Sequence, residues 1–473
     1  MIIITFVIGL EVNMKLDKKN NFTILESSTI GEGLLKIDKN KIGMVFITDI
    51  EERVIGVSSD GDIRSGLLNN RKLSDSLKTV YNSNFVWEKD TADRESILKL
   101  LDSKIKVIPI LNSEKRLVEV ITKEDFPIVI ERNIFARSKA PVRVGFAGGG
   151  SDLTHYFMDE LGAVLNATIT LYCHASLRPR DDKKISIDSF DLAEKINFID
   201  LDDLVSTSDN FDLVRSVLKL IKPEFGFELA ITSDFPFGSG LGGSAAVMVA
   251  ILGCFNEFRK DKWNDYEIAE IAFQAERLYM GVAGGWQDQY AAVFGGFNFI
   301  EFKQDNNLIH PLRLREKTIL ELQENLFLFE VSSGRNSGNI HDDQKTTMKS
   351  SKVLDLVQKN VNLCYNMREN LLRHKLTEFG SDLNRNWQLK RQFGAKISNN
   401  NIDEVYEYAI KHGALGGKLL GAGGGGFFIF YVEPANQNSF LGAMRNKGFE
   451  RTVFNFDHDG MKSWTNREVT KAN

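Results

Sequence analysis

The chain carries a glycine-rich segment, Pro236-Phe-Gly-Ser-Gly-Leu-Gly-Gly-Ser-Ala-Ala246, that runs directly into the apolar stretch 247–252. Glycine lets a backbone approach an anion closely, because no Cβ stands in the way. Free N–H groups and the positive end of a helix dipole would then face that anion. No Gly-Lys-Ser/Thr follows, so the segment is not the common P-loop. Its pattern predicts either an ordinary turn or a phosphate-binding loop at the start of a helix.

Two further glycine clusters each adjoin a strand-like apolar run. They read Lys139-Ala-Pro-Val-Arg-Val-Gly-Phe-Ala-Gly-Gly-Gly-Ser-Asp152 and Gly417-Lys-Leu-Leu-Gly-Ala-Gly-Gly-Gly-Gly-Phe-Phe-Ile-Phe-Tyr431. Between them lies Gln274-Ala-Glu-Arg-Leu-Tyr-Met-Gly-Val-Ala-Gly-Gly-Trp-Gln-Asp-Gln-Tyr290, which holds two carboxylates. Phosphoryl transfer needs positioned phosphates, a metal that neutralises charge and often a base for the acceptor hydroxyl. The glycine clusters could hold the phosphates, and the two carboxylates could bind the metal and act as the base.

In this order, the three glycine motifs resemble those of the GHMP small-molecule kinases, over about residues 135–455. The run Gly-Gly-Trp-Gln-Asp-Gln, followed by Gly-Gly-Phe-Asn-Phe, resembles the branch that holds D-glycero-D-manno-heptose 7-phosphate kinases and related sugar kinases. The resemblance implies an α+β fold with a ribosomal-S5-like lobe at 132–325 and a ferredoxin-like lobe at 326–473. It also implies ATP and Mg²⁺, and an active site between the lobes.

The resemblance implies that the loop wraps the phosphates of ATP through backbone N–H groups. Ser244 would contact Mg²⁺ or a β-phosphate oxygen, and Glu276 would complete the metal site; the alternative for Glu276 is a solvated helix glutamate. The family usually has two serines where this chain has Gly243 and Ser244, so the role of the first is absent or supplied by backbone. The expected nucleotide-binding residues are Pro236, Gly238, Ser239, Gly240, Leu241, Gly242, Gly243, Ser244 and Ala245.

Two residues match the family's catalytic positions. Asp288 matches the aspartate that accepts the proton of the sugar hydroxyl, and Arg143 matches the basic residue near that base and the transferring phosphate. We expect the amide side chains of Gln287 and Gln289 to hold Asp288 by hydrogen bonds. The alternative for Asp288 is a turn aspartate that caps a helix.

Sugar binding is assigned by the same resemblance. Asp152 matches the aspartate that binds sugar hydroxyls, although it could instead cap the helix that follows. Arg178 and Arg180 are additional candidate cations for a substrate phosphate, and a solvated surface role is an equal alternative for every such cation. The third glycine cluster is expected to be a turn that shapes the phosphate loop from behind. The expected substrate-binding residues are Gly149, Gly150, Ser151, Asp152, Arg335, Ser337 and Lys390.

The segment 14–130 contains two similar halves, each reading helix, strand, short turn, strand and helix start. This repeat resembles a pair of cystathionine β-synthase (CBS) domains, which implies an adenine nucleotide as ligand and makes a homodimer one of the expected assemblies. Ser59 with Asp62, and Thr122 with Asp125, match the Ser/Thr-x-x-Asp that contacts such a nucleotide. The alternative is that these residues are helix N-caps. Glu119 stands where a glycine is usual, which weakens the second site.

Bulk composition limits the function classes. A length of 473 residues predicts two or three domains, and a net charge of −5 argues against general binding to nucleic acid or an anionic membrane. Cys173, Cys254 and Cys364 are far apart and odd in number, which predicts reduced, buried thiols in a cytoplasmic protein. The apolar stretch 1–13 is too short to span a bilayer, and we expect it to be a non-structural leader before Met14.

The sequence therefore predicts an ATP-dependent sugar kinase. By resemblance its acceptor is the anomeric C1 hydroxyl of D-glycero-D-manno-heptose 7-phosphate, and its product feeds nucleotide-sugar and surface polysaccharide synthesis. One alternative is an L-fucose-type kinase that acts on an unphosphorylated sugar. Another is a catalytically silent sensor of nucleotide and sugar. The presence of Arg143, Glu276 and Asp288 argues against the silent sensor.

Overall fold

The computed structural model describes residues 21–92, 94–101, 105–122, 131–236, 238–282, 284–332 and 350–469. Contacts divide the chain into two compact units, residues 1–130 and residues 131–473. Each unit is considered by itself below. None of the helices within the described ranges is long and apolar enough to cross a membrane.

The first unit consists of two halves, each with the helix followed by two strands that the sequence repeat predicts, and each preceded by a short strand that it does not predict. In each half the first strand pairs parallel with the second, and the second pairs antiparallel with the third. Phe46 and Val54 of the first half share one apolar core with Val107, Leu111 and Leu117 of the second. The elements are β1 (Thr23–Leu25), α2 (Ile30–Asn40), β2 (Met44–Thr48), β3 (Val54–Ser59), α3 (Asp60–Leu68), η1 (Leu77–Thr79), β4 (Glu88–Lys89), α4 (Arg94–Leu100), β5 (Val107–Leu111) and β6 (Leu117–Thr122).

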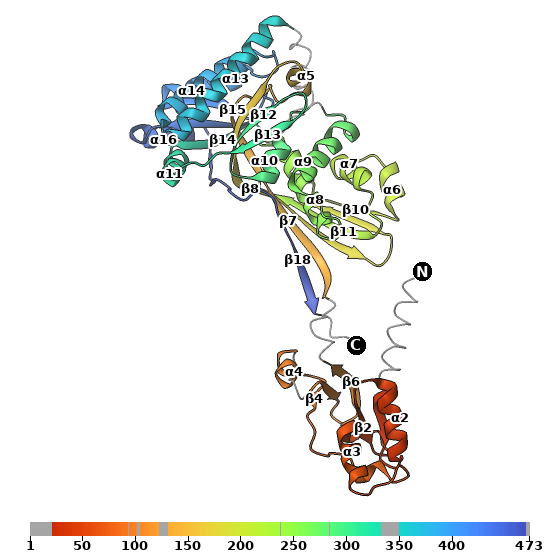
Figure 1. Cartoon of the computed structure of the whole chain (residues 1–473). Helices are drawn as coiled ribbons and strands as arrows, with labels where there is room; N and C mark the ends of the chain where they lie inside the picture. Colours follow the sequence, from red (N-terminus) through yellow and green to blue (C-terminus); the bar gives the residue numbers. More distant parts are fainter. Residues whose placement is uncertain are drawn as a thin grey trace. The chain divides into compact units, whose positions relative to one another are not determined.

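The second unit begins with an eight-stranded sheet in which the long strand β8 pairs with β7, β11 and β12 (Figure 1). The helix α8 packs against β7 and β8 and is apolar almost all round, which explains why it is buried. The elements are β7 (Glu131–Ala147), α5 (Thr154–Phe157), β8 (Gly162–Arg180), β9 (Ile185–Ser189), β10 (Glu194–Phe198), α6 (Leu201–Ser206), α7 (Asp212–Ile221), β11 (Gly226–Ser233), α8 (Gly243–Asn256), α9 (Asp265–Gln274), η3 (Ala275–Tyr279), α10 (Gln287–Phe294), β12 (Phe297–Phe302) and β13 (Asn307–Pro311).

The same unit continues into a four-stranded antiparallel sheet of order β15-β16-β14-β17. The helices α13 and α14 pack on each other, and α14 also packs on β15 (Figure 1). Together the two sheets make the α+β, two-lobe fold that the sequence predicts. The elements are α11 (Glu316–Asn325), β14 (Leu326–Ser332), α13 (Ser351–Leu372), α14 (Leu376–Lys390), α15 (Asn400–Lys411), β15 (Ala414–Leu419), β16 (Gly426–Val432), η4 (Pro434–Asn436), α16 (Gln437–Asn446), β17 (Arg451–Thr452) and β18 (Lys462–Val469).

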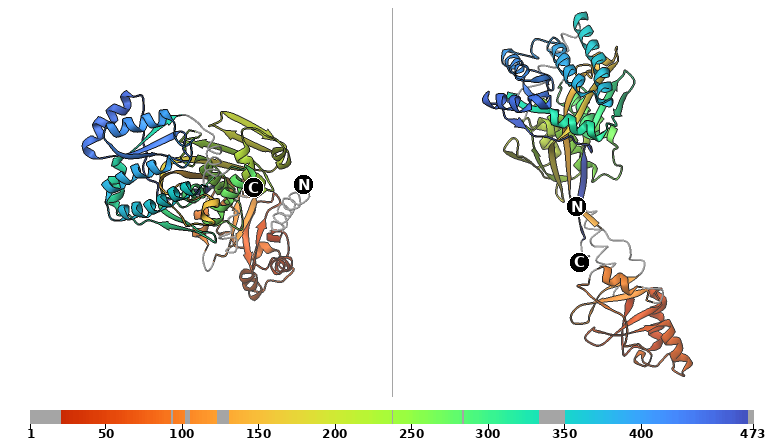
Figure 2. Two further views of the ribbon diagram at one scale, coloured as in Figure 1. Left: turned by 90° about the horizontal axis from the view of Figure 1, so that it is seen from above. Right: turned by 90° about the vertical axis from the view of Figure 1, so that its left-hand side faces the viewer.

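The last strand corrects the expected lobe boundary. Residues 326–473 were expected to form the second lobe, but β18 pairs antiparallel with β7 in the sheet of the first lobe. In Figure 1 and in the right-hand view of Figure 2, β18 (blue) lies beside β7 (orange). The physical reason is that β8 pairs with only one edge of β7, so β18 satisfies the backbone groups of the other edge.

The two lobes of the second unit share one continuous apolar core. Its members come from β7, β8, α8, β12, α13, α14 and β16. Cys173, Cys254 and Cys364 are free thiols buried in this core, as the sequence predicts. A shared core fixes the two lobes against each other and therefore holds any site between them in a defined geometry.

Candidate active site

The predicted phosphate loop lies immediately before α8. Gly238, Gly240 and Gly242 have φ of 73°, 75° and 83°, a region that favours glycine. Gly242 is the N-cap of α8 and offers no side-chain acceptor, so the first N–H groups of the helix remain available to an anion. This geometry leaves room for an anion at the N-terminus of α8, as a phosphate-binding loop requires.

The third glycine cluster packs directly behind this loop, as expected. A Cβ on Gly421 would lie 2.6 Å from Gly240 Cα, and a Cβ on Gly426 would lie 2.3 Å from Ser239 O. The backbone N–H of Phe427 donates to Ser239 O at 3.2 Å. Only glycine permits this close approach of two backbones, so the second lobe fixes the shape of the loop.

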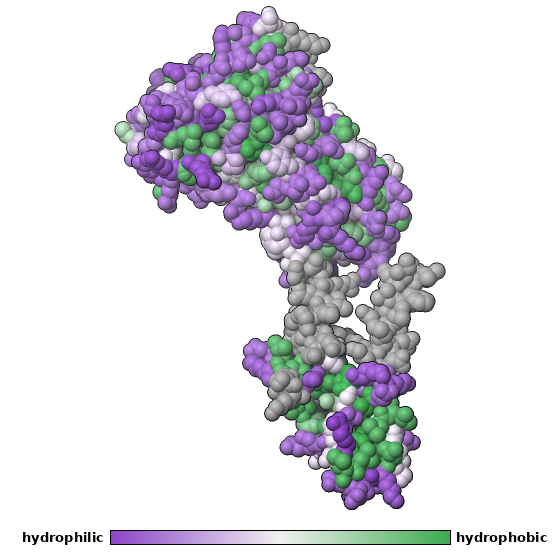
Figure 3. Space-filling model, in the orientation of Figure 1, coloured by the Kyte–Doolittle hydropathy of each residue, from purple (hydrophilic) through white to green (hydrophobic). Residues whose placement is uncertain are grey.

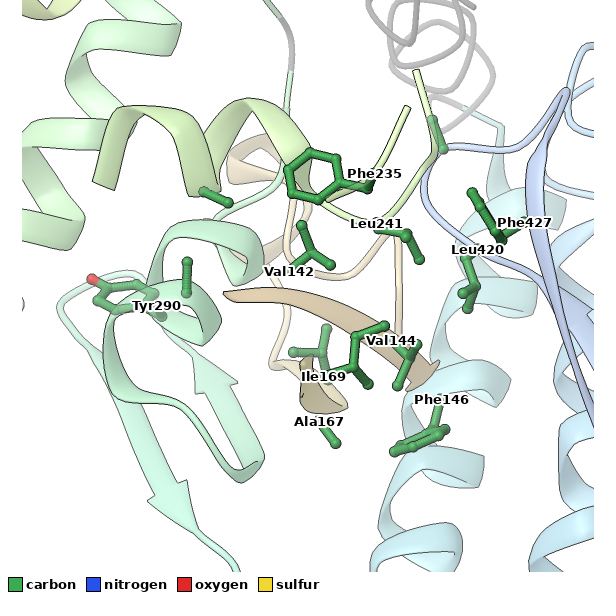
Figure 4. Close-up of a cluster of buried hydrophobic side chains, with 14 of the residues drawn as sticks. Val142, Val144, Phe146, Ala167, Ile169, Phe235, Leu241, Tyr290, Leu420 and Phe427 are labelled. Atoms are coloured by element: carbon green, nitrogen blue, oxygen red, sulfur yellow. The ribbon is translucent and has the colours of Figure 1, made fainter. Parts of the chain in front are cut away.

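An apolar anchor holds the tip of the loop. Leu241 is fully buried, and Figure 4 shows it between Val142 and Val144 on one side and Leu420 and Phe427 on the other. Val142 and Val144 belong to β7, whereas Leu420 and Phe427 flank the third glycine cluster. The loop backbone is thereby positioned by both lobes.

Arg143 joins the candidate base to the phosphate loop. Its Nε and Nη2 donate to Asp288 Oδ1 at 2.9 and 2.7 Å, and its Nη1 donates to Gly240 O at 2.7 Å. Arg143 is buried on β7, whereas the carboxylate of Asp288, in the first turn of α10, is partly exposed. Asp288 therefore faces an arginine across the site, which contradicts the alternative of a turn aspartate that only caps a helix.

The expected role of the two glutamines is wrong. Gln287 Nε2 donates to Asp152 Oδ2 at 2.8 Å, and Gln289 Nε2 donates to Glu276 Oε2 at 2.8 Å. Neither amide binds Asp288. The reason is helical geometry, because adjacent residues of α10 point in different directions around the helix axis. Helix α10 therefore positions three carboxylates: that of Asp288, which belongs to the helix, and those of Asp152 and Glu276, which the two glutamines bind.

Asp152 is directed toward the cavity and does not cap a helix. Its Oδ1 accepts from the N–H of Gly150 at 3.0 Å, and the N-cap of α5 is Leu153, with no side-chain hydrogen bond. Ser151, by contrast, is fully buried, and its hydroxyl donates to Gly148 O at 2.8 Å. The expected sugar-binding role of Ser151 is thus not supported, because its hydroxyl is used in holding the turn.

Burial sets the charge state of the carboxylates. Desolvation, together with the charge of Asp288, raises the pKa of Glu276 to about 7, although the hydrogen bond from Gln289 opposes this. Desolvation also raises the pKa of Asp288, with the charge of Asp152 adding to the effect and Arg143 opposing it. Perturbed pKa values of this kind gather at functional sites.

Glu276 occupies a suitable position for a metal ligand. It lies in the π-helical turn η3, a feature frequent at functional sites, and the residue as a whole is half-buried. The described residues contain no group of three or more His, Cys, Asp or Glu that could hold a metal alone. A cation here would therefore depend on Glu276, the hydroxyl of Ser244 and phosphate oxygens. That donor set of hard oxygens suits Mg²⁺, and a cation would relieve the repulsion between Glu276 and Asp288.

The structure brings Lys390 to the site and adds a lysine that the sequence analysis missed. Lys390 ends α14, is 4% exposed and donates to Leu419 O and Gly421 O. Lys418 lies on β15, is 3% exposed and donates to Phe146 O at 3.3 Å. Its signal in the sequence was a lone charge in the apolar run that leads into the third glycine cluster.

Two other predicted cations, Arg178 and Arg180, do not reach this site. Arg178 and Arg180 lie at the end of β8 and do not line the cavity described below, and Arg180 pairs with Asp182 and Glu228. Arg335 and Ser337 lie outside the described residues.

A cavity of ≈ 460 Å³ joins these parts. The phosphate loop, the turn at 149–152, the start of α10 and the third glycine cluster all contribute to its wall. Of the predicted nucleotide-binding residues, Leu241 is buried beneath the loop rather than in the wall. The charged residues that line the cavity are Arg143, Asp152, Asp191, Glu276, Asp288, Lys390 and Lys418.

The candidate ligand residues of the first unit form a helix cap. Asp62 N donates to Ser59 Oγ at 3.1 Å, and Ser59 N donates to Asp62 Oδ2 at 2.8 Å, which makes a capping box at the start of α3. The helix-cap alternative is therefore what the structure contains at this position. Thr122 ends β6, and Asp125 lies outside the described residues.

Comparisons with known proteins agree with this geometry. Sequence models of the GHMP kinases N terminal domain and the GHMP kinases C terminal domain match residues 212–296 and 367–450. A D-glycero-alpha-D-manno-heptose 7-phosphate kinase from Campylobacter jejuni is 35% identical over 334 residues, which are 69% of this chain and 98% of that protein. An L-fucokinase/L-fucose-1-P guanylyltransferase from Bacteroides fragilis is 27% identical over 62% of this chain and 34% of its own length.

Solved structures of sugar kinases are also similar to this chain. A D-glycero-D-manno-heptose 1-phosphate kinase from Bacteroides thetaiotaomicron has 29% identity and a TM-score of 0.58, with coverage of 70% of this chain and 98% of that chain. A putative sugar kinase from Campylobacter jejuni has 33% identity, the same TM-score and the same coverage. With three glycine motifs around one cavity and this degree of identity over nearly the whole of a relative, the chain belongs to the GHMP kinase family.

Proposed function

We propose that this protein transfers the γ-phosphoryl group of ATP to the anomeric C1 hydroxyl of D-glycero-D-manno-heptose 7-phosphate. The observation that carries the proposal is the contact of Arg143 with both Asp288 and Gly240 O, because it joins the candidate base to the phosphate loop. The relative with 35% identity, which bears the name of a heptose 7-phosphate kinase, supports the choice of acceptor. A role in nucleotide-sugar and surface polysaccharide synthesis would follow from such a product.

In this mechanism the loop N–H groups hold the ATP phosphates at the start of α8. Asp288 accepts the proton of the sugar hydroxyl, whose oxygen bonds to the γ-phosphorus as the bond to the β–γ bridging oxygen breaks. Burial raises the pKa of Asp288, which makes the ionised form a stronger base. Arg143 orients that carboxylate, and Asp152 would bind neighbouring hydroxyls of the sugar.

Mg²⁺, held by Glu276, Ser244 and phosphate oxygens, would neutralise charge on the nucleotide phosphates. The carboxylate of Glu276 must be ionised to serve as a ligand. Because its pKa is raised to about 7, protons compete with the metal as the pH falls through neutrality.

We predict that Glu276→Gln raises the Mg²⁺ concentration needed for half-maximal activity and lowers kcat. The wild-type requirement should also rise as the pH falls below about 7, and the variant should lose that dependence. Titration of Mg²⁺ at several pH values, with ATP held constant, is the measurement. Glu270→Gln, an exposed change on α9, serves as the control. An unchanged Mg²⁺ requirement in the variant would remove Glu276 from the metal site.

A second candidate acceptor is an unphosphorylated sugar, because the Bacteroides fragilis relative is named as an L-fucokinase. A coupled ADP-release assay distinguishes the two candidate acceptors. Its substrates are heptose 7-phosphate, the free heptose, L-fucose and hexose phosphates. We expect kcat/KM for heptose 7-phosphate to exceed that for the free sugars by at least about tenfold, since each charge-assisted hydrogen bond to a phosphate is worth about 1.5–3 kcal/mol. Equal efficiency on the free sugar would favour the fucokinase-like function.

We further propose that the first unit is a CBS pair that binds an adenine nucleotide at Ser59 and Asp62 and also mediates dimerisation. The repeated topology supports the CBS assignment. To bind the nucleotide, Ser59 and Asp62 would exchange the hydrogen bonds of their capping box for contacts with it. Hydrophobic residues gather on the face of this unit seen in Figure 3, and apolar surface of this kind often marks an interaction site. Leu35, Ile50 and Leu68 are strongly exposed.

We predict that AMP binds the full chain and changes its affinity for the sugar by about 5- to 150-fold, the range typical of coupled sites. Such a change requires that AMP bind two conformational states with different affinity. Calorimetry with AMP, at saturating non-hydrolysable ATP analogue, measures binding outside the active site. Asp62→Asn should abolish it, whereas Asp60→Asn, also on α3 but paired with Arg64, should not. No heat and unchanged kinetics would leave the unit with a purely structural role.

A further inference from the structure

Two buried lysines of the cavity wall have no role in the transfer step described above. Lys390 and Lys418 are 4% and 3% exposed, and both contribute to the lining of the cavity. They come from different elements, since Lys390 is the last residue of α14 and Lys418 lies near the end of β15. Lysine is rarely buried to this extent unless its charge is paired.

The hydrogen bonds of these lysines do not neutralise them. Lys390 Nζ donates to Leu419 O and Gly421 O, and Lys418 Nζ donates to Phe146 O, so every acceptor is a neutral carbonyl. Among the described residues, no carboxylate forms an ion pair with either ammonium group. An ammonium group has three donors, so each lysine keeps at least one for a further acceptor.

The nearby carboxylates are directed elsewhere. Asp288 accepts from Arg143, and Asp152 accepts from Gln287 and Gly150 N. Desolvation lowers the pKa of Lys390 to about 8, and it also lowers the pKa of Lys418, with the charge of Lys390 as the next cause. Burial and mutual repulsion therefore disfavour the charged form of both lysines. An anion that accepts hydrogen bonds from both would favour that form.

We propose that Lys418 and Lys390 together form an anion subsite for a phosphate group. This rests on the proposed function, since a kinase of this family handles phosphate in the same cavity. Two sources can supply the group: a terminal phosphate ester on the sugar, or the phosphoryl group in transfer. Both present the same chemistry, a dianionic cluster of oxygens that accepts hydrogen bonds from ammonium groups.

The test uses Lys418→Met in the full chain, with Lys411→Met, an exposed change on α15, as the matched control. The first readout is thermal stability with and without inorganic phosphate. Removal of a buried, unpaired charge should leave the ligand-free protein as stable as the wild type or more so. With the phosphate loop occupied by a non-hydrolysable ATP analogue in every sample, the stabilisation that added phosphate gives the wild type should be lost in Lys418→Met and kept in Lys411→Met.

The second readout is kinetic and separates the sources. If the subsite holds the sugar's phosphate, Lys418→Met raises KM for the sugar phosphate by about 10- to 150-fold and leaves the free sugar unaffected. If it holds the phosphoryl group in transfer, kcat falls by a similar factor for both sugars. Lys418→Arg should recover part of either effect, because it keeps the charge.

The proposal is overturned if Lys418→Met retains the phosphate-induced stabilisation and wild-type kinetics. A second pair of results would also overturn it. In that case ligand-free Lys418→Met is strongly destabilised, and correctly folded Lys418→Arg binds phosphate no better than Lys418→Gln. The lysine would then have a structural role. Phosphate binding is measured without turnover, so a failure of the proposed kinase reaction on heptose 7-phosphate would not be mistaken for a failure of the subsite.

Discussion

Asp288→Asn is expected to lower kcat by about 10²–10⁴-fold, the usual contribution of a general base, while ATP binding stays close to that of the wild type. The asparagine keeps an oxygen that can accept from Arg143, so the contact that now measures 2.7–2.9 Å should persist. It cannot take the proton of the sugar hydroxyl. Single-turnover kinetics at saturating substrates, with ATP affinity measured by calorimetry, separates chemistry from binding.

The control for this change is Asp182→Asn. Asp182 also pairs with an arginine, Arg180, but the pair lies outside the cavity. This variant should keep wild-type kcat. An Asp288→Asn protein that retains more than about a tenth of the wild-type kcat would exclude the residue as the base.

Gly421→Ala is expected to damage the phosphate loop from behind. The new Cβ would lie 2.6 Å from both Cα and O of Gly240, and Gly421 has a φ of 67°. The loop must shift to relieve the clash, so we expect KM for ATP to rise by about tenfold or more, as for the loss of about one charge-assisted hydrogen bond. Overpacking of this kind should also lower the free energy of unfolding by about 1–3 kcal/mol.

Gly442→Ala is the matched control for that change. Gly442 lies within α16, and a Cβ there would meet nothing within 4 Å. Alanine should therefore be neutral or raise the free energy of unfolding by about 0.5–1 kcal/mol, because glycine is costly inside a helix. Chemical denaturation and ATP titration on both variants provide the measurement. A Gly421→Ala protein with wild-type KM for ATP would contradict the supporting role of the third glycine cluster.

The fold could be predicted where glycine motifs adjoin apolar runs. The run after Gly242 becomes the buried helix α8, and the run after Gly425 becomes the buried strand β16. The return of β18 to the first sheet could not be predicted, because strand pairing over more than 300 residues leaves no local signal.

The candidate site could also be predicted from the sequence only in part. The contact of Arg143 with Asp288 follows from motif positions, since both residues belong to motifs that converge on the loop. The partners of Gln287 and Gln289 depend on helix rotation and on where Asp152 and Glu276 arrive from other elements. Sequence neighbours on a helix diverge in direction, so adjacency in sequence was misleading.

Lys418 was missed for a different reason. A single lysine near the end of a strand is usually a surface residue, and only the burial of both faces of β15 shows otherwise. Ser151 shows the opposite case: its place in the first glycine motif suggested a ligand contact, but its hydroxyl binds only backbone groups.

The measurement that tests the central claim most directly is ³¹P NMR of the full protein incubated with ATP, Mg²⁺ and D-glycero-D-manno-heptose 7-phosphate. The account predicts a new anomeric phosphate signal that grows in step with ADP and is absent with the Asp288→Asn variant. Formation of ADP and free inorganic phosphate without a second sugar phosphate signal would contradict phosphoryl transfer to the C1 hydroxyl.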